Sequence, residues 1–154
     1  MKLLMVVVAL GLSMSANAGL MDKIKIKKAV AAADAKVHAE ISAVKKACGN
    51  KSLSLAVNWD KWKSYKLNVS KHESTINYVA TVIVNEVLTT MKDACKDADY
   101  KEVIGQVTKL DITGKDKFSD MYMDFSYDKG TLHVKVNGDG YGSWKNKELF
   151  MKSW

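Results

Sequence analysis

Residues 76–95 read INYVATVIVNEVLTTMKDAC, and this stretch decides the fold because its apolar residues recur every three or four positions. That spacing places them on one face of a helix, so it predicts a helix that buries this face. Residues 70–73 read SKHE, a capping box in which Ser70 caps the helix and Glu73 bonds back to it. The predicted buried face consists of Ile76, Val79, Ala80, Ile83, Val84, Val87, Leu88, Met91 and Cys95.

A second long helix is predicted upstream, over residues 22–48. Gly49 follows it as a C-terminal stop, because glycine readily adopts the left-handed conformation that ends helices. Each of the two predicted helices therefore ends with a cysteine on its apolar face. The apolar face of this upstream helix consists of Ile26, Val30, Ala33, Val37, Ile41, Val44 and Cys48.

Cys48 and Cys95 are the two cysteines of the chain. They predict one disulfide, which would bring the C-terminal ends of both helices within about 7 Å between Cα atoms. A reactive thiol or a metal-binding pair is the alternative, and an exported chain favours the disulfide. No C-x-x-C motif supports a thioredoxin-like redox role.

The first eighteen residues have the organisation of a secretory signal peptide. Met1 and Lys2 form a charged start, residues 3–12 are apolar or small, and Ala16-Asn17-Ala18 is a small-x-small cleavage site. The apolar run is shorter than the roughly 20 residues of a transmembrane helix. We therefore expect a signal peptide at 1–18, a single domain at 19–154, and a location in the periplasm or outside the cell.

Alternating patterns predict strands after each helix. Residues 52–59 alternate cleanly, and residues 102–113 alternate with a break near Lys109 that suggests a bulge. A hairpin is predicted over 121–136, with Asp128-Lys129-Gly130 as its connection. A short last helix would carry Trp144, Leu149 and Phe150.

These elements predict an α+β protein. Two amphipathic helices would pack on a mostly antiparallel sheet of about four strands, in the order α-β-α-β-β-β-α. This order is similar to that of cystatin-like proteins. The similarity covers the order of elements alone, so it implies a topology and no function.

All of the positive charge comes from lysine. The chain has 24 lysines, no arginine and a net charge of +7, which becomes 23 − 17 = +6 without the signal peptide. A basic exported protein can meet lipopolysaccharide, teichoic acid, anionic lipid or an acidic protein. The absence of arginine argues against a dedicated phosphate or nucleic-acid reader. A simple solvating role for lysine is the alternative.

Two groups of residues form a candidate interaction surface. Lysines at the start of the first helix would contact an anionic membrane or glycan, and a frayed helix end is the alternative. Aromatic side chains near the predicted loops would anchor a partner, and packing at the ends of the sheet is the alternative. The surface residues are Lys23, Lys25, Lys27, Lys28, Trp62, Tyr122, Tyr141 and Trp144.

Catalytic and metal-binding patterns are weak. His38, His72 and His133 have no metal-ligand spacing, so no metal or cofactor is expected. Asp124 and His133 lie on outward faces of neighbouring predicted strands, where a carboxylate beside a histidine can do acid–base work. No Gly-x-Ser-x-Gly nucleophile motif accompanies them.

The expected function is therefore binding. We expect a small exported, non-enzymatic protein of the bacterial envelope, or a secreted one, of an inhibitor, immunity or accessory type. Its partner would be an envelope or secreted protein, or an anionic glycan, and not a nucleic acid. One alternative is a small exported hydrolase that uses an Asp/His pair. Another is a basic protein that binds anionic surfaces.

Overall fold

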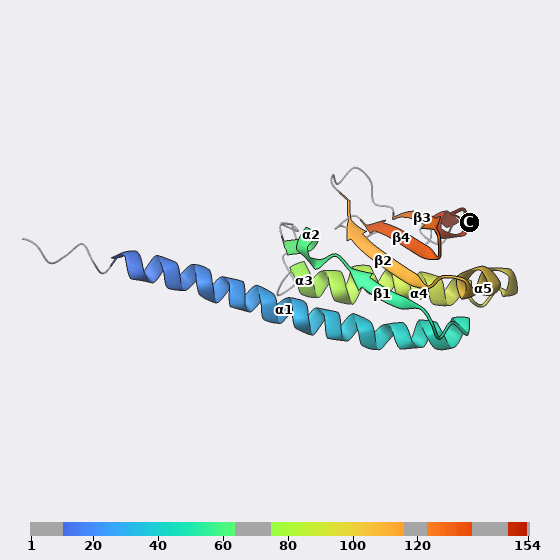
Figure 1. Cartoon of the computed structure of the whole chain (residues 1–154), viewed down its shortest axis with the longest axis horizontal. Helices are drawn as coiled ribbons and strands as arrows, with labels where there is room; N and C mark the ends of the chain where they lie inside the picture. The colour runs from blue at the N-terminus through green and yellow to red at the C-terminus, as the bar shows by residue number, and fades with distance from the viewer. Residues whose placement is uncertain (1–10, 64–74, 116–122, 137–147, 154) are drawn as a thin grey trace, which may run out of the picture.

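The computed structural model describes residues 11–63, 75–115, 123–136 and 148–153. The protein is α+β, with its helices on one side of a four-stranded mixed sheet (Figure 1). The α+β class predicted from the sequence is confirmed.

Helix α1 (Gly11–Cys48) packs against a second helical segment that runs in the same direction (Figure 1). This segment comprises α3 (Thr75–Tyr78), the π-helical turn η1 (Val79–Val84) and α4 (Asn85–Ala94). All nine residues of its predicted apolar face are buried, which confirms the helical interpretation of residues 76–95. The π-turn was not predicted, because i→i+5 bonding leaves no distinct spacing in so short a run.

The sheet has the strand order β1-β2-β4-β3. Strands β1 (Ser54–Val57) and β2 (Lys109–Gly114) are parallel, β2 and β4 (Thr131–Val136) are parallel, and β3 (Asp124–Asp128) is antiparallel to β4. The expectation of a mostly antiparallel sheet was therefore wrong. The helices between β1 and β2 form a crossover that returns the chain in the same direction, and the β3–β4 hairpin places β4 rather than β3 beside β2.

Two strand boundaries differ from those predicted. Helix α5 (Ala98–Gly105) occupies the start of the predicted strand 102–113, and Asp97 caps it by accepting a hydrogen bond of 3.0 Å from the backbone N of Asp99. Trp59 begins the short helix α2 (Trp59–Lys63) instead of ending β1. In each place one buried side chain that fits a strand pattern, Trp59 or Ile104, belongs to a short helix. Periodicity over a few residues cannot distinguish a short helix from a strand.

The β3–β4 hairpin agrees with its predicted turn. Lys129 and Gly130 both have positive φ, 45° and 81°, as a two-residue type I′ connection requires. The register pairs Asp128 with Thr131, directly across this turn. The capping box at 70–73 and the glycine-rich stretch at 137–142 lie outside the described residues.

The C-terminal segment packs against β3. Residues 148–151 are helical, and Phe150 is fully buried. Its ring meets that of Phe125 on β3 edge to face, with centroids 5.4 Å apart and planes at 81°. The predicted last helix is thus present at its described end.

Candidate functional site

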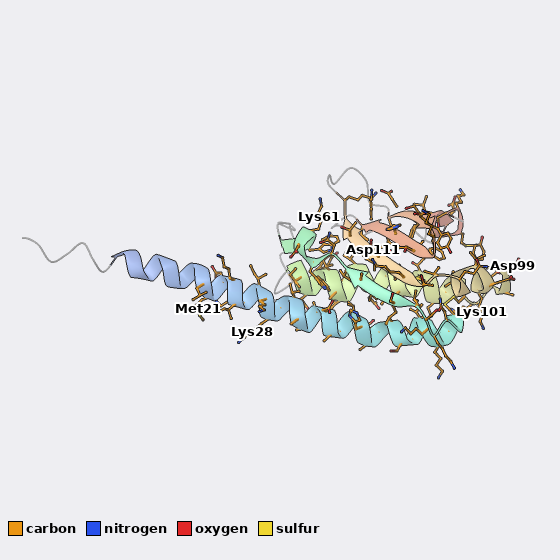
Figure 2. All side chains as sticks on the ribbon, viewed as in Figure 1. Met21, Lys28, Lys61, Asp99, Lys101 and Asp111 are labelled. Carbon is orange, nitrogen blue, oxygen red and sulfur yellow. A yellow bond between two sulfur atoms is a disulfide. The ribbon has the colours of Figure 1, made fainter. Side chains whose placement is uncertain are left out.

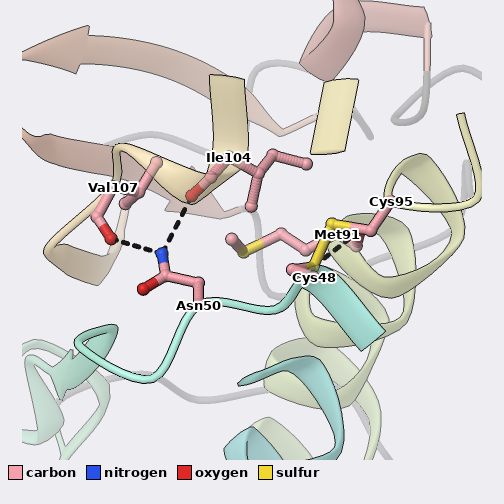
Figure 3. The surroundings of a disulfide bond; sticks show 6 residues. All are labelled: Cys48, Asn50, Met91, Cys95, Ile104 and Val107. Carbon is pink, nitrogen blue, oxygen red and sulfur yellow. Dashed lines mark hydrogen bonds between the residues drawn. A yellow bond between two sulfur atoms is a disulfide. The ribbon is translucent and has the colours of Figure 1, made fainter. Parts of the chain in front are cut away.

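A disulfide joins the C-terminal ends of the two long helical segments (Figure 3). Cys48 ends α1 and Cys95 follows α4, with 5.1 Å between their Cα atoms. Both cysteines are buried, as expected for residues on apolar helix faces. The predicted pairing is confirmed, and it fixes α1 firmly at this end of the protein.

Asn50 links the turn after α1 to the end of α5. Its side-chain N donates to the carbonyl oxygens of Ile104 at 2.9 Å and Val107 at 2.7 Å (Figure 3). Its side-chain O accepts from the hydroxyl of Ser52 at 2.9 Å and the backbone N of Leu53 at 3.1 Å. Asn50 is only 3% exposed, so these four bonds satisfy a polar group that burial would otherwise penalise.

A third contact holds α1 near its middle. The indole Nε1 of Trp59 on α2 donates to Asp34 Oδ1 at 2.8 Å. From Ala33 onward α1 contributes buried residues to the core, whereas Ala29 and Val30 are only partly buried. The part of α1 that is N-terminal to Ala29 projects past the rest of the protein (Figure 1).

We call residues 20–28 the α1 tip. All nine are exposed, and they extend for about 14 Å along the helix. Among the residues whose side chains the structure describes, five large hydrophobic side chains are exposed, and four of them belong to the tip. They are Leu20 at 56%, Met21 at 53%, Ile24 at 39% and Ile26 at 41%.

The tip is also strongly basic. It carries four lysines and one acidic residue, Asp22, so its net side-chain charge is 4 − 1 = +3. The lysines are the predicted Lys23, Lys25, Lys27 and Lys28, and all four are exposed. Met21 and Lys28 point to the same side of the helix, away from the sheet (Figure 2). The tip therefore combines exposed aliphatic side chains with a local excess of positive charge.

Ile26 was predicted to belong to the buried face of α1, and this prediction was wrong. Its spacing to Val30 and Ala33 continues the row that faces the core, yet it is exposed. The reason is that α1 is longer than the structure that packs against it. Leu20, Met21 and Ile24 were not identified as surface candidates from the sequence, although they lie off the core-facing row and so could have been.

The outward face of the sheet carries a second group of polar residues. His133 on β4 pairs in register with Asp111 on β2, and His133 Nδ1 lies 3.2 Å from Asp111 Oδ2. Asp124 pairs in register with Lys135, and its Oδ1 lies 3.0 Å from the Nζ of Lys115. The carboxylate beside His133 is therefore Asp111 and not the predicted Asp124.

The His133–Asp111 pair is partly open to solvent. The side chains are 42% and 33% exposed, and Lys109 Nζ lies 3.9 Å from the other oxygen of Asp111. A cross-strand pair of this kind stabilises a sheet face, and it can also move a proton. Within the described ranges, no cluster of three or more His, Cys, Asp or Glu residues is placed to hold a metal ion.

The predicted aromatic surface is not assembled in the described residues. Trp62 is fully buried in the core, so its assignment to an interaction surface was wrong. The ring belongs to α2, whose inner side packs against α3. Tyr122, Tyr141 and Trp144 lie outside the described residues.

Among the described residues, no helix has the combination of length and apolar character needed to cross a bilayer. Comparisons of the chain with protein-family models, with curated proteins and with solved structures find no match.

Proposed function

We propose that this chain is a small exported binding protein, non-enzymatic, that works by surface contact in the bacterial envelope or outside the cell. The observation that carries the proposal is the α1 tip, where exposed Leu20, Met21 and Ile24 stand beside four lysines. Monomeric proteins seldom leave several large aliphatic side chains together in water, and such patches mark interaction sites. An envelope or secreted protein and an anionic glycan both fit a basic surface.

Two features support export. The buried Cys48–Cys95 disulfide suits an oxidising compartment. Residues 1–18 have the charged start, apolar run and small-x-small site of a signal peptide. Intact mass measurement of the protein from its host tests this part, with a chain that begins at Gly19 as the expected result.

Photo-crosslinking in the host tests the binding role. Ala31 is exposed and lies three turns from Leu20 on the same helix face, so a photoreactive residue there samples the surroundings of the tip without altering it. Lys92, exposed on α4, is the matched control position. We expect an adduct with a protein, a glycan or a lipid from position 31 and none from position 92. Equal labelling at both positions, or none at either, would contradict a binding role for α1.

Hydrolysis is the second candidate function, and the His133–Asp111 distance of 3.2 Å is the observation in its favour. The test replaces His133 by Ala and Asp111 by Asn in the purified protein, with Asp128→Asn as an exposed control on β3. A turnover of ester, amide or glycoside substrates that both site variants abolish, while folding is retained, would establish the enzyme. Its absence in the parent protein would leave binding as the function.

A further inference from the structure

We propose that the α1 tip attaches this protein to an anionic lipid bilayer, with the helix axis lying along the membrane surface. This inference rests on the proposed binding function and names the partner of the tip. It requires an apolar face that a bilayer can reach, positive charge around that face, and a reason to prefer lipid over another occupant. The described residues supply all three.

The apolar face of the tip is directed away from the rest of the protein. Leu20 and Ile24 are one turn apart, and Met21 lies beside them. At 100° per residue these three side chains lie about 100–160° around the helix from the row that faces the core. Figure 2 agrees, since Met21 points away from the sheet and α3. A flat surface can therefore meet this face without touching the sheet.

The charges of the tip are arranged to suit the same surface. Lys23 and Lys27 lie one turn apart on one flank, while Lys25 lies on the other. Lys28 lies two turns beyond Met21 on the apolar face itself, and long lysine stems can bury while the ammonium group reaches the headgroups. Asp22 lies on the opposite side of the helix. The negative charge is thus kept away from the proposed contact.

The composition of the tip favours lipid over a protein partner or a second copy. Hot spots of protein interfaces are rich in Trp, Tyr and Arg, and leucine is under-represented in them. The tip has leucine, methionine, isoleucine and lysine, with no aromatic residue or arginine. Two copies that met through their tips would bring eight lysines together. Anionic lipid instead neutralises each lysine and receives the aliphatic side chains.

Vesicle co-sedimentation tests the proposal with the protein expressed from its complete gene, its N-terminus checked by intact mass. The probes are vesicles of equal parts phosphatidylglycerol and phosphatidylethanolamine, and vesicles of phosphatidylcholine alone. We expect binding to the anionic vesicles at about 25 mM salt that weakens by about tenfold or more at about 0.5 M salt. Phosphatidylcholine vesicles should bind at least about tenfold less.

Three variants distinguish binding through the α1 tip from binding through the overall positive charge of the protein. Leu20→Gln/Met21→Gln/Ile24→Gln should weaken the partition coefficient by at least about tenfold. Replacing the four tip lysines by Gln should weaken it by about a hundredfold or more. The matched control removes four exposed lysines elsewhere, Lys36, Lys46, Lys51 and Lys92, and should stay within about threefold of the parent. All substituted positions are exposed, and unfolding midpoints verify that each variant folds.

Four outcomes would overturn the proposal that the tip binds a bilayer. No binding of the parent to anionic vesicles, equal binding to phosphatidylcholine, or equal losses in both lysine variants would overturn the bilayer as partner. So would a dimer in sedimentation velocity that the apolar variant abolishes, because the tip would then be an interface between copies. If crosslinking at position 31 still yields a protein or glycan adduct, the binding function stands and only the lipid assignment falls.

Discussion

Asn50 shows how a single buried polar residue can organise a junction. It connects the turn after α1 with the end of α5 through four hydrogen bonds, and no sequence pattern marked it. Its partners are two backbone carbonyls, a backbone N–H and a hydroxyl. The hydroxyl and the N–H belong to the neighbouring Ser52 and Leu53, whereas the carbonyls lie 54 and 57 residues further along the chain, so the complete set forms only once α5 has packed beside the turn.

Replacing Asn50 by Ala should reduce the free energy of unfolding by about 2–4 kcal/mol, because the carbonyls of Ile104 and Val107 and the N–H of Leu53 lose their partner. Urea denaturation followed by circular dichroism measures the change. Asn85→Ala, at an exposed helical position, is the control and should change stability by less than about 0.5 kcal/mol. Equal effects of the two substitutions would contradict the assigned role.

Gly130 is a second position where one residue type is required. Its φ is 81°, and an added Cβ would lie 2.9 Å from the Oγ1 of Thr108. Gly130→Ala should therefore destabilise the protein by about 1–2 kcal/mol. Gly105 has no atom within 4 Å of such a Cβ and ends α5, so Gly105→Ala should be neutral or stabilising by up to about 1 kcal/mol. Thermal unfolding of both variants measures the contrast, and a tolerated Gly130→Ala would refute it.

At the scale of elements, amphipathic helices were predicted well and short segments poorly. The nine apolar residues of 76–95 give enough repeats to define a helical face, even though a π-turn interrupts it. Helix α5 and β2 share the run 98–114, where too few repeats distinguish a helix from a strand. Strand direction is also undetermined by alternation, since parallel and antiparallel strands show the same period.

The contact between β3 and the C-terminal helical turn is an element-level prediction. Phe150→Ala should cost about 3–4 kcal/mol, because a fully buried ring leaves a cavity. A double-mutant cycle with Phe125→Ala should give a coupling energy of about 1 kcal/mol from their edge-to-face contact. Guanidinium unfolding of the parent and the three variants supplies the cycle. A coupling energy near zero would mean that the two rings act independently.

At the scale of the whole molecule, the disulfide holds together the ends of two parallel helical segments, while the other end of α1 stays outside the core. The Cys48–Cys95 bond spans 47 residues of sequence, so it removes much conformational freedom from the unfolded chain. The same fixed end gives the projecting tip a defined direction relative to the sheet. The disulfide thus supports both the fold and the proposed membrane contact.

Removal of both sulfurs, by Cys48→Ala/Cys95→Ala, should reduce the free energy of unfolding by about 4 kcal/mol. Chemical denaturation of the parent, with and without reductant, provides the comparison. Because both cysteines are buried, we also expect the native protein to resist a reductant until it unfolds. A variant as stable as the oxidised parent would show that the bond contributes little.

The sequence by itself determined the α+β class, the inward faces of the long helices apart from Ile26, the disulfide and the hairpin turn. Each of these depends on local spacing, or on a pair of residues with no other partner in the chain. Only the tertiary structure decided the parallel order of the strands, Asp111 as the neighbour of His133, the burial of Trp62 and the exposure of Ile26. These depend on which distant elements meet and where the packing ends, and a periodic pattern such as that of Ile26, Val30 and Ala33 continues regardless of whether anything covers it.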